Sequence, residues 1–190
     1  NVTRVNWAAG YLDELLRTLD GLFYAVQIDP DLDPLLATLE RGEPAESELA
    51  RREIARLLSG SYYTHSRVVD EVQLYVHATG TAIAVDNVSS GRILSPDAAA
   101  GPWRGILDGP VPLLLQRVGT ALYAVHSINR FMDQSLRGAI AVRLDDGIAE
   151  RVSGILAAGG QDSIYVLNQR GEPLIRAVGE SSADVAAVVS

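Results

Sequence analysis

The chain contains no cysteine and no lysine. Without cysteine it can form neither disulfides nor thiolate-ligated metal sites, and it has no thiol nucleophile. Its 16 basic residues are all Arg, and its 24 acidic residues give a net charge of −8. Because an acidic chain without a basic run is a poor ligand for a phosphate backbone, we expect no direct contact with nucleic acid.

Long apolar runs are also missing. No segment has the length of apolar residues that spans a bilayer, and no basic-then-apolar signal peptide opens the chain. The first residue is Asn1 rather than Met, which indicates a piece cut from a longer protein. With 190 residues, 47% of them hydrophobic and 21% charged, the chain has a globular composition and enough residues for a core.

The motifs of common enzyme classes are absent from the sequence. We find no serine nucleophile elbow, no lysine-containing phosphate loop, no dinucleotide fingerprint and no zinc-protease motif. The spacing of His65, His77 and His126 does not suit metal ligation, and local packing or hydrogen bonding is the favoured role for each. We therefore expect no enzymatic activity, no catalytic residue, no bound metal and no cofactor.

One acidic stretch follows the count of a calcium loop. Asp29, Asp31, Asp33 and Glu40 occupy the first, third, fifth and twelfth places, but Pro34 stands at the sixth, where the sharp turn needs Gly. A helix junction accounts for the same residues. We predict that Asp33 is an N-cap and Pro34 the first residue of a short helix over 35–40.

The first thirty residues carry the clearest periodicity. Apolar residues recur at alternating steps of three and four, at Val5, Ala8, Leu12, Leu15, Leu19, Leu22 and Val26. This spacing predicts a long amphipathic helix, which either lies along a sheet or pairs with a copy of itself. A further helix is predicted over 46–59.

From Val68 the periodicity changes from helical to that of strands. Alternation predicts strands over 72–77 and 81–85 joined by a turn at Thr79-Gly80, and further strands over 119–128 and 136–145. The Gly-, Pro- and Ser-rich segment 87–116 resembles a loop. A helix with apolar residues at 148, 152, 155 and 156 follows and ends at Gly159-Gly160, and then come strands over 163–167 and 173–178 around a turn at Gly171.

The second hairpin repeats the first. Leu74-Tyr75-Val76 matches Ile164-Tyr165-Val166, and a helix precedes each hairpin, so we expect two modules in tandem. The predicted boundaries are a helical segment over 1–60, a first module over 61–146, and a second module over 147–190. The second module is too short to close a sheet of its own, and is either small or truncated.

The order of these elements resembles a known family. The long N-terminal helix, the strand 72–77, the lone Trp103, the strand 137–145 and the hairpin 165–172 look like the double Cache extracytoplasmic sensor domains of Gram-positive transmembrane receptors. Those receptors are chiefly sensor histidine kinases, together with membrane-tethered regulators of the AraC type. The resemblance implies an α+β fold in which the long helix packs on an antiparallel PAS-like (Cache) sheet. It also implies membrane spans on both sides of this segment.

Strand alternation selects the candidate ligand-binding residues. If Val72, Leu74, Val76, Ile140, Val142 and Leu144 face the long helix, then Tyr75, His77 and Arg143 point the other way. Tyr123 and Trp103 would add aromatic surface, and Arg143, Arg104 or Arg117 would bind a carboxylate or phosphate group. The predicted ligand-binding residues are Tyr75, His77, Trp103, Arg104, Tyr123 and Arg143. The alternative is that Tyr75 and Tyr123 form a cross-strand pair in a second small core.

These features favour one function and leave others open. We expect the extracytoplasmic ligand-sensing domain of a transmembrane receptor of the histidine kinase type, binding a small molecule or a ligand-loaded solute-binding protein. A homodimer through the N-terminal helix would relay the signal. The alternatives are the sensor of a membrane-bound AraC-type regulator, an extracellular interaction scaffold, and a small hydrolase with unrecognised motifs.

Overall fold

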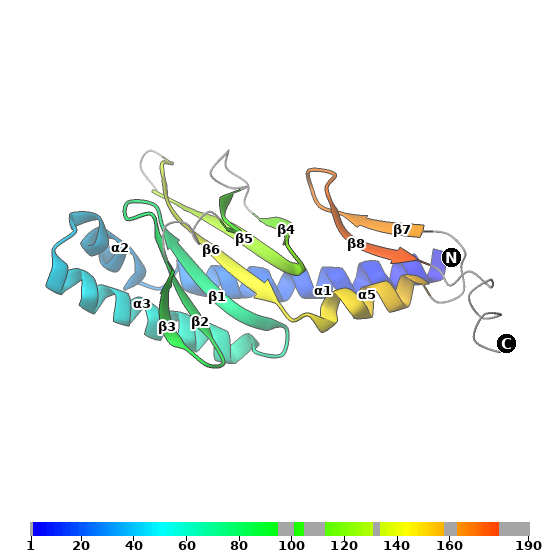
Figure 1. The fold of residues 1–190 in the computed structure, drawn as a ribbon, viewed down its shortest axis with the longest axis horizontal. Helices are drawn as coiled ribbons and strands as arrows, with labels where there is room; N and C mark the ends of the chain where they lie inside the picture. Colours follow the sequence, from blue (N-terminus) through cyan, green and yellow to red (C-terminus); the bar gives the residue numbers. More distant parts are fainter. Residues whose placement is uncertain (1, 95–100, 105–112, 131–133, 158–162, 179–190) are drawn as a thin grey trace.

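The structure is a computed structural model, and it describes residues 2–94, 101–104, 113–130, 134–157 and 163–178. It is an α+β structure in which a long N-terminal helix lies along an antiparallel sheet of six strands, which confirms the expected fold class (Figure 1). The helices are α1 (Val2–Gln27), α2 (Leu32–Arg41), α3 (Pro44–His65) and α5 (Gly147–Ala157). The strands are β1 (Val69–Val76), β2 (Thr81–Asp86), β3 (Ser90–Leu94), β4 (Leu114–Val118), β5 (Ala121–Asn129), β6 (Leu136–Leu144), β7 (Ser163–Leu167) and β8 (Pro173–Val178).

The six-stranded sheet has the order β3-β2-β1-β6-β5-β4, and every neighbouring pair is antiparallel. Its two central strands are far apart in sequence, and their register pairs Leu74 with Ile140 and Gln73 with Ala141. Because side chains alternate between the faces of a strand, this register sets Leu74 and Ile140 on one face and Gln73 and Ala141 on the other. We call these the first face and the second face.

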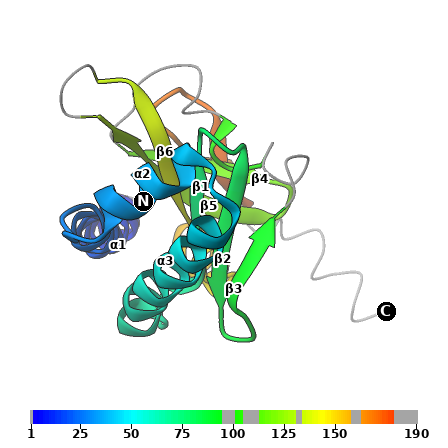
Figure 2. The same cartoon turned by 90° about the vertical axis from the view of Figure 1, so that its left-hand side faces the viewer.

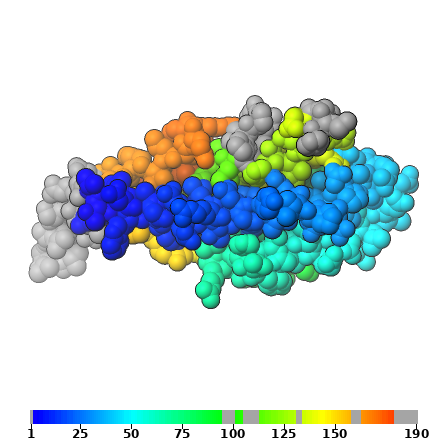
Figure 3. Space-filling model, turned by 180° about the vertical axis from the view of Figure 1, so that it is seen from behind, coloured from blue at the N-terminus to red at the C-terminus, as the bar shows by residue number. Residues whose placement is uncertain are grey.

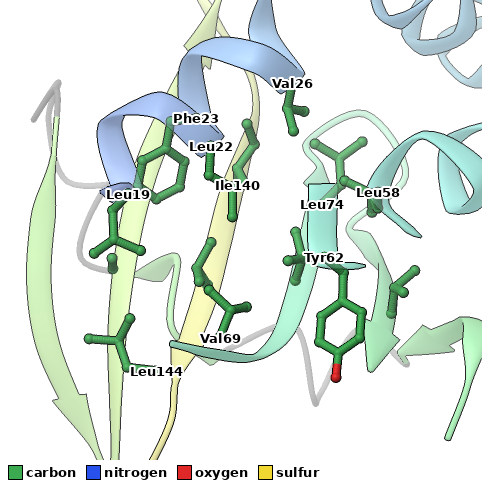
Figure 4. Close-up of a cluster of buried hydrophobic side chains, with 14 of the residues drawn as sticks. Leu19, Leu22, Phe23, Val26, Leu58, Tyr62, Val69, Leu74, Ile140 and Leu144 are labelled. Carbon is green, nitrogen blue, oxygen red and sulfur yellow. The ribbon is translucent and has the colours of Figure 1, made fainter. Parts of the chain in front are cut away.

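The first face carries the main hydrophobic core. Helices α1 and α3 lie on this side of the sheet (Figure 2). Their apolar side chains meet those of the central strands in a dry cluster (Figure 4). Leu19, Leu22, Leu58, Leu74 and Ile140 are all 0% exposed. At about 25 cal/mol per Å² of apolar surface, this cluster is the chief source of the stability of the fold.

The C-terminal elements lie at the other end of the molecule from α2. Helix α5 packs against α1 and β8, and β7 and β8 form a separate two-stranded sheet beside the N-terminal half of α1 (Figures 1 and 3). Gly171 closes their hairpin with φ +77°, a left-handed conformation that glycine adopts without strain. Two hydrogen bonds attach the hairpin to β4: Asn168 Nδ2 donates to the Leu115 carbonyl at 2.9 Å, and Arg117 Nη1 donates to the Leu174 carbonyl at 3.1 Å.

Most of the predicted elements are present with small shifts of their ends. The two hairpins and the strands over 119–128 and 136–145 are confirmed. Helix α3 continues past its predicted end at Ser59 to His65, and Tyr62 in that last turn is buried. The segment 87–116, which looked like a loop, contains β3 and the first residues of β4.

The predicted cap of the second helix is wrong. Helix α2 starts at Leu32, and the N-cap position is Asp31, whose side chain makes no capping bond. Asp33 lies inside the first turn, where its carboxylate instead accepts a hydrogen bond from Arg137. Asp33 is therefore used in an ion pair with the buried Arg137 guanidinium, a distant contact that the local sequence does not predict.

Glu40, the last acidic residue of the calcium-loop count, also binds arginine. Arg137 Nε donates to Glu40 Oε1 at 3.0 Å, and Arg130 Nη2 donates to Glu40 Oε2 at 2.7 Å. Burial alone would raise the pKa of this carboxyl group, but the two guanidinium groups outweigh burial and hold the pKa below its usual value of 4.5. Asp33 and Glu40 therefore serve an ion-pair cluster that joins α2 to β6.

Candidate functional site

The middle of the second face has a floor of small side chains. Four alanines form it, each no more than 1% exposed: Ala82 and Ala84 of β2, and Ala139 and Ala141 of β6, the two strands that flank β1. On the first face the same strands carry bulky Leu, Ile and Val side chains. Three of the four alanines, all but Ala84, belong to a second buried hydrophobic cluster, so the second face is also covered, but its own side chains are smaller than those of the first face.

Aromatic rings stand at one end of this floor. The rings of Tyr75 and Trp103 are stacked, with centroids 5.2 Å apart and an interplanar angle of 10°. Trp103 is 0% exposed and belongs to the same buried cluster as Tyr75, Leu114 and Val125. This end of the second face is therefore a buried apolar cluster built around two stacked aromatic rings.

Polar residues cross the other end of the floor in one row. Pairing in the register places Asp86, Glu71, Arg143, Tyr123 and Gln116 next to one another on five successive strands, from β2 to β4. Along β1 this row lies four residues from Tyr75, which is about 13 Å at the rise of a strand. A ligand on this face would therefore meet aromatic rings at one end and charged groups at the other.

Ion pairs hold three members of the polar row: Glu71, Arg143 and Asp86, whose Oδ2 lies 3.8 Å from Arg92 Nη2. Arg92 Nη2 from β3 donates to Glu71 Oε1 at 2.9 Å, and the Glu71 side chain is only 7% exposed. Arg143 Nη2 donates to Asp70 Oδ2 at 3.5 Å, a long bond between half-buried groups. Glu71 is thus bound at Oε1 by an arginine from β3, two strands away, and Arg143 is bound at Nη2.

The pKa values of the acidic groups near Arg143 shift in different directions, upward for Asp70 and Tyr123 and downward for Asp86. Burial raises the pKa of Asp70 although Arg143 counteracts it, and burial together with the charge of Glu71 raises the pKa of the Tyr123 hydroxyl. For Asp86, burial acts in the same direction but is outweighed by the backbone N–H groups of Val88 and Ser89, which lower its pKa. At neutral pH the row therefore holds a neutral phenol beside charged groups of both signs.

Three buried polar atoms of this face have no hydrogen-bond partner. They are Gln73 Oε1 in the middle of the floor, and Gln116 Nε2 and Arg143 Nε in the polar row. Across the described ranges the only other such side-chain atom is Ser47 Oγ on α3. Each unpaired buried donor or acceptor lowers the stability of the fold by about 1–3 kcal/mol. Three such atoms on one face therefore indicate a role other than stabilising the fold.

The structure brings together four of the six residues predicted to bind a ligand. Tyr75, Trp103, Tyr123 and Arg143 all belong to the second face. His77 follows the end of β1 and is exposed, with its ring 6.3 Å from that of Tyr75.

The other two arginines considered for anion binding lie outside the polar row. Arg104 is exposed, and Arg117 donates to the hairpin backbone. The sequence reasoning also missed Gln73, Gln116 and Glu71. A signal was available for Gln73, because a glutamine amid the apolar residues of β1 is a buried polar group in need of a purpose.

Two cavities are found away from these groups. One, of about 400 Å³, is bounded by α1, α5, the hairpin and the ends of β5 and β6. The other, also of about 400 Å³, lies beside α2 and is lined by Gln27, Asp33, His126 and Arg137 among others. Neither cavity is lined by Gln73, Gln116 or Arg143.

Neither a metal-binding cluster nor a membrane-spanning helix is present among the residues that the structure describes. Over the parts of the chain that the structure describes, no three His, Asp or Glu side chains gather closely enough to hold a metal ion. Within those same parts, none of the helices combines the length and the apolarity that a bilayer crossing requires.

Comparison with known proteins gives structural similarity alone. No protein-family model matches the chain, and no curated protein matches it. The sensory domain of the Campylobacter jejuni chemoreceptor Tlp3 (CcmL) with isoleucine bound is similar with a TM-score of 0.48 and 12% identity, over 100% of this chain and 80% of that one. The ligand-binding domain of Tlp3 in complex with 4-methylisoleucine has a TM-score of 0.47 and 10% identity, over 92% of this chain and 69% of that one. The same domain in complex with L-valine has a TM-score of 0.44 and 14% identity, over 92% of this chain and 71% of that one. Similarity at this level establishes neither a common family nor a common ligand.

Proposed function

We propose that this chain is the extracytoplasmic ligand-sensing domain of a transmembrane receptor and that a small molecule binds on the second face of its sheet. The observation that carries the proposal is the group of three unpartnered buried atoms on that face, Gln73 Oε1, Gln116 Nε2 and Arg143 Nε. A structural core would leave such atoms out, because each one lowers stability. A bound molecule would give each of them a partner.

The chemistry of the three atoms defines the class of ligand. Arg143 Nε and Gln116 Nε2 are donors and lie in the same row, so they suit an acceptor such as a carboxylate. Gln73 Oε1 is an acceptor and suits a hydroxyl or ammonium group. The stacked Tyr75 and Trp103 would contact an apolar part. We therefore expect a small carboxylate that carries a hydrogen-bond donor and an apolar group.

Signal output in this proposal passes through α1. The buried side chains of α1 pack on the first face of the sheet, and the proposed site lies on the opposite face of the same strands. A ligand that changes the shape of the sheet would therefore also change how α1 packs on it. The outer surface of α1 exposes Trp7 (72%) and Tyr24 (65%), and Ile28 (58%) follows its last residue. These apolar residues support pairing of α1 with a second copy of the chain, as expected for a dimeric receptor. A strictly monomeric protein in light scattering at millimolar concentration would contradict the pairing.

The nature of the receptor follows from the sequence resemblance. A histidine kinase output is proposed, with an AraC-type regulator as the alternative, and both require membrane spans beside this segment. The full-length sequence decides between them. A cytoplasmic kinase module or a DNA-binding module would identify the output, and a protein without any span would refute the receptor assignment.

The ligand proposal is tested by a thermal-shift screen of small carboxylates with and without an amino or hydroxyl group, followed by calorimetry. A ligand at 100 times its Kd stabilises the protein by about 2.7 kcal/mol. We expect the shift to disappear in Arg143→Ala and Tyr75→Ala. The matched controls are Arg176→Ala and Tyr63→Ala, which alter an Arg on the hairpin and an exposed Tyr on α3, and both should keep the shift.

Two results would overturn this assignment. A flat screen combined with tight binding of another protein would favour the interaction scaffold. Equal loss of the shift in the control variants would mean that the ligand binds elsewhere.

A further inference from the structure

The cavity beside α1 is a second candidate site, which shares Tyr123 with the second face but none of the three unpartnered atoms there. Its volume is about 400 Å³, within the range of small-molecule sites. Its walls are mainly aliphatic and come from separate elements: Leu12 and Leu16 from α1, Ile148 from α5, and Val166 and Ile175 from the hairpin. We call it the junction cavity, because it lies where the long helix, the six-stranded sheet and the hairpin meet.

Fixed polar contacts hold the hairpin in place beside this space. Asn168 and Arg117 tie the hairpin to β4 at 2.9 Å and 3.1 Å, and Ser153 Oγ of α5 donates to the Arg176 carbonyl of β8 at 3.5 Å. These bonds set the position of the hairpin from the sheet and α5 sides. Leu12 and Leu16 of α1 remain half-buried opposite the hairpin. The cavity is thus an apolar space whose walls are kept apart by bonds elsewhere.

One charged side chain lines the junction cavity. The carboxylate of Asp13 makes no hydrogen bond or ion pair with any residue that the structure describes, and no arginine belongs to the cavity wall. The nearest cation along α1, Arg17, is bound to Glu14 at 3.4 Å. Asp13 is exposed, so its negative charge acts from the solvent side of the cavity, where it favours a positively charged group and disfavours a carboxylate. Gln169, on the hairpin turn, adds an amide to the same lining.

We infer that the junction cavity binds an alkylammonium compound, with its chain against the leucines and its ammonium group at Asp13. At roughly 30 Å³ for each water-sized group, the cavity accommodates about a dozen non-hydrogen atoms, the size of an amine with eight to ten carbons. This ligand differs in charge from the carboxylate proposed for the second face. The two sites can therefore be told apart by ligand and by variant.

The test is isothermal titration calorimetry with n-octylammonium, 1-octanol and octanoate, all below their aggregation concentrations. We expect octylammonium to bind about tenfold more tightly than octanol, and octanoate more weakly than either. Asp13→Asn should lower the affinity for octylammonium to that for octanol and leave octanol unchanged. Asp20→Asn is the matched control on an exposed position of α1 that does not line the cavity, and it should behave as wild type.

Cavity-filling variants test the location. Leu12→Trp should abolish binding of all three compounds, and Ala9→Leu, at an exposed helix position that lines the cavity, should weaken it without endangering the fold. Arg143→Ala should leave octylammonium binding intact, so a failure of the second-face proposal would not affect this one. Unchanged binding in both filling variants, or equal affinity for octylammonium and octanoate, would overturn the inference.

Discussion

The two faces of the central sheet are built from the same strands but follow opposite rules. On the first face Leu74 and Ile140 pack against α1 and α3, whose buried side chains are apolar except for Ser47 and Tyr62. On the second face the neighbouring positions hold Gln73 and Ala141, and three buried polar atoms lack partners. The apolar packing of the first face stabilises the fold. The three unpaired polar atoms of the second face lower its stability, as is typical of a functional site.

The largest effect is expected from truncating the first face. Leu74→Ala should lower the free energy of unfolding by about 2–5 kcal/mol, because the side chain is 0% exposed and leaves a cavity. Gln73→Ala, one residue away, should stay within about 1 kcal/mol of wild type, since it also removes an unpaired acceptor. Urea denaturation measures both. Equal losses at the two positions would mean that the two faces are packed alike.

A smaller effect of opposite sign is expected when the second face is made apolar. Gln73→Met keeps the length of the side chain and removes the unpaired oxygen, so it should raise stability by about 1–2 kcal/mol and the Tm by roughly 2–8 °C. The same variant should lose ligand binding. Calorimetry and thermal denaturation give the two readouts.

Gln27→Met provides the contrast to this variant. Gln27 Nε2 is hydrogen-bonded to His126 Nδ1 at 2.7 Å, so its replacement should cost about 0.5–1.5 kcal/mol. A loss of stability in Gln73→Met would show that Gln73 is a satisfied core residue, and the second face would then be a second core.

The smallest effect concerns the pH dependence of the polar row. Because the folded pKa of Asp86 is lowered, its stabilisation is present above its unfolded value near 3.8 and is lost as the pH falls through the folded pKa. Asp86→Asn should therefore be about 1 kcal/mol less stable than wild type at pH 7. The difference should shrink below about pH 3.8, as measured by urea denaturation at a series of pH values. A difference that does not change with pH would assign the effect to packing.

The sequence predicted the elements that have local signals. The heptad pattern gave α1, and the turn at Gly171 gave the β7–β8 hairpin, because both depend on residues close together in the chain. Alternation in β1 and β6 also placed Tyr75 and Arg143 opposite the helix-packed residues. A face of a strand can be read from its own residues once the apolar face is known.

Other features depend on contacts between distant segments. The strand β3 has no buried residue and β4 has only Leu114, so neither shows the alternation that reveals a strand. The polar row joins Glu71 to Gln116 across four strands, and nothing in the local sequence fixes that strand order. Asp33 looked like a helix cap because its partner, Arg137, lies 104 residues away.

The bonds between the hairpin and β4 have a further consequence for the solubility of the protein. β4 is an edge strand, and such a strand is a template on which another chain can add. Asn168 occupies the Leu115 carbonyl, and the hairpin stands beside this edge. At the opposite edge, β3 is short, has an irregular register with β2 and carries Arg92. Features of both edge strands therefore disfavour edge-to-edge aggregation. At β4 this feature is the attached hairpin, and at β3 it is the irregular register and the charge of Arg92.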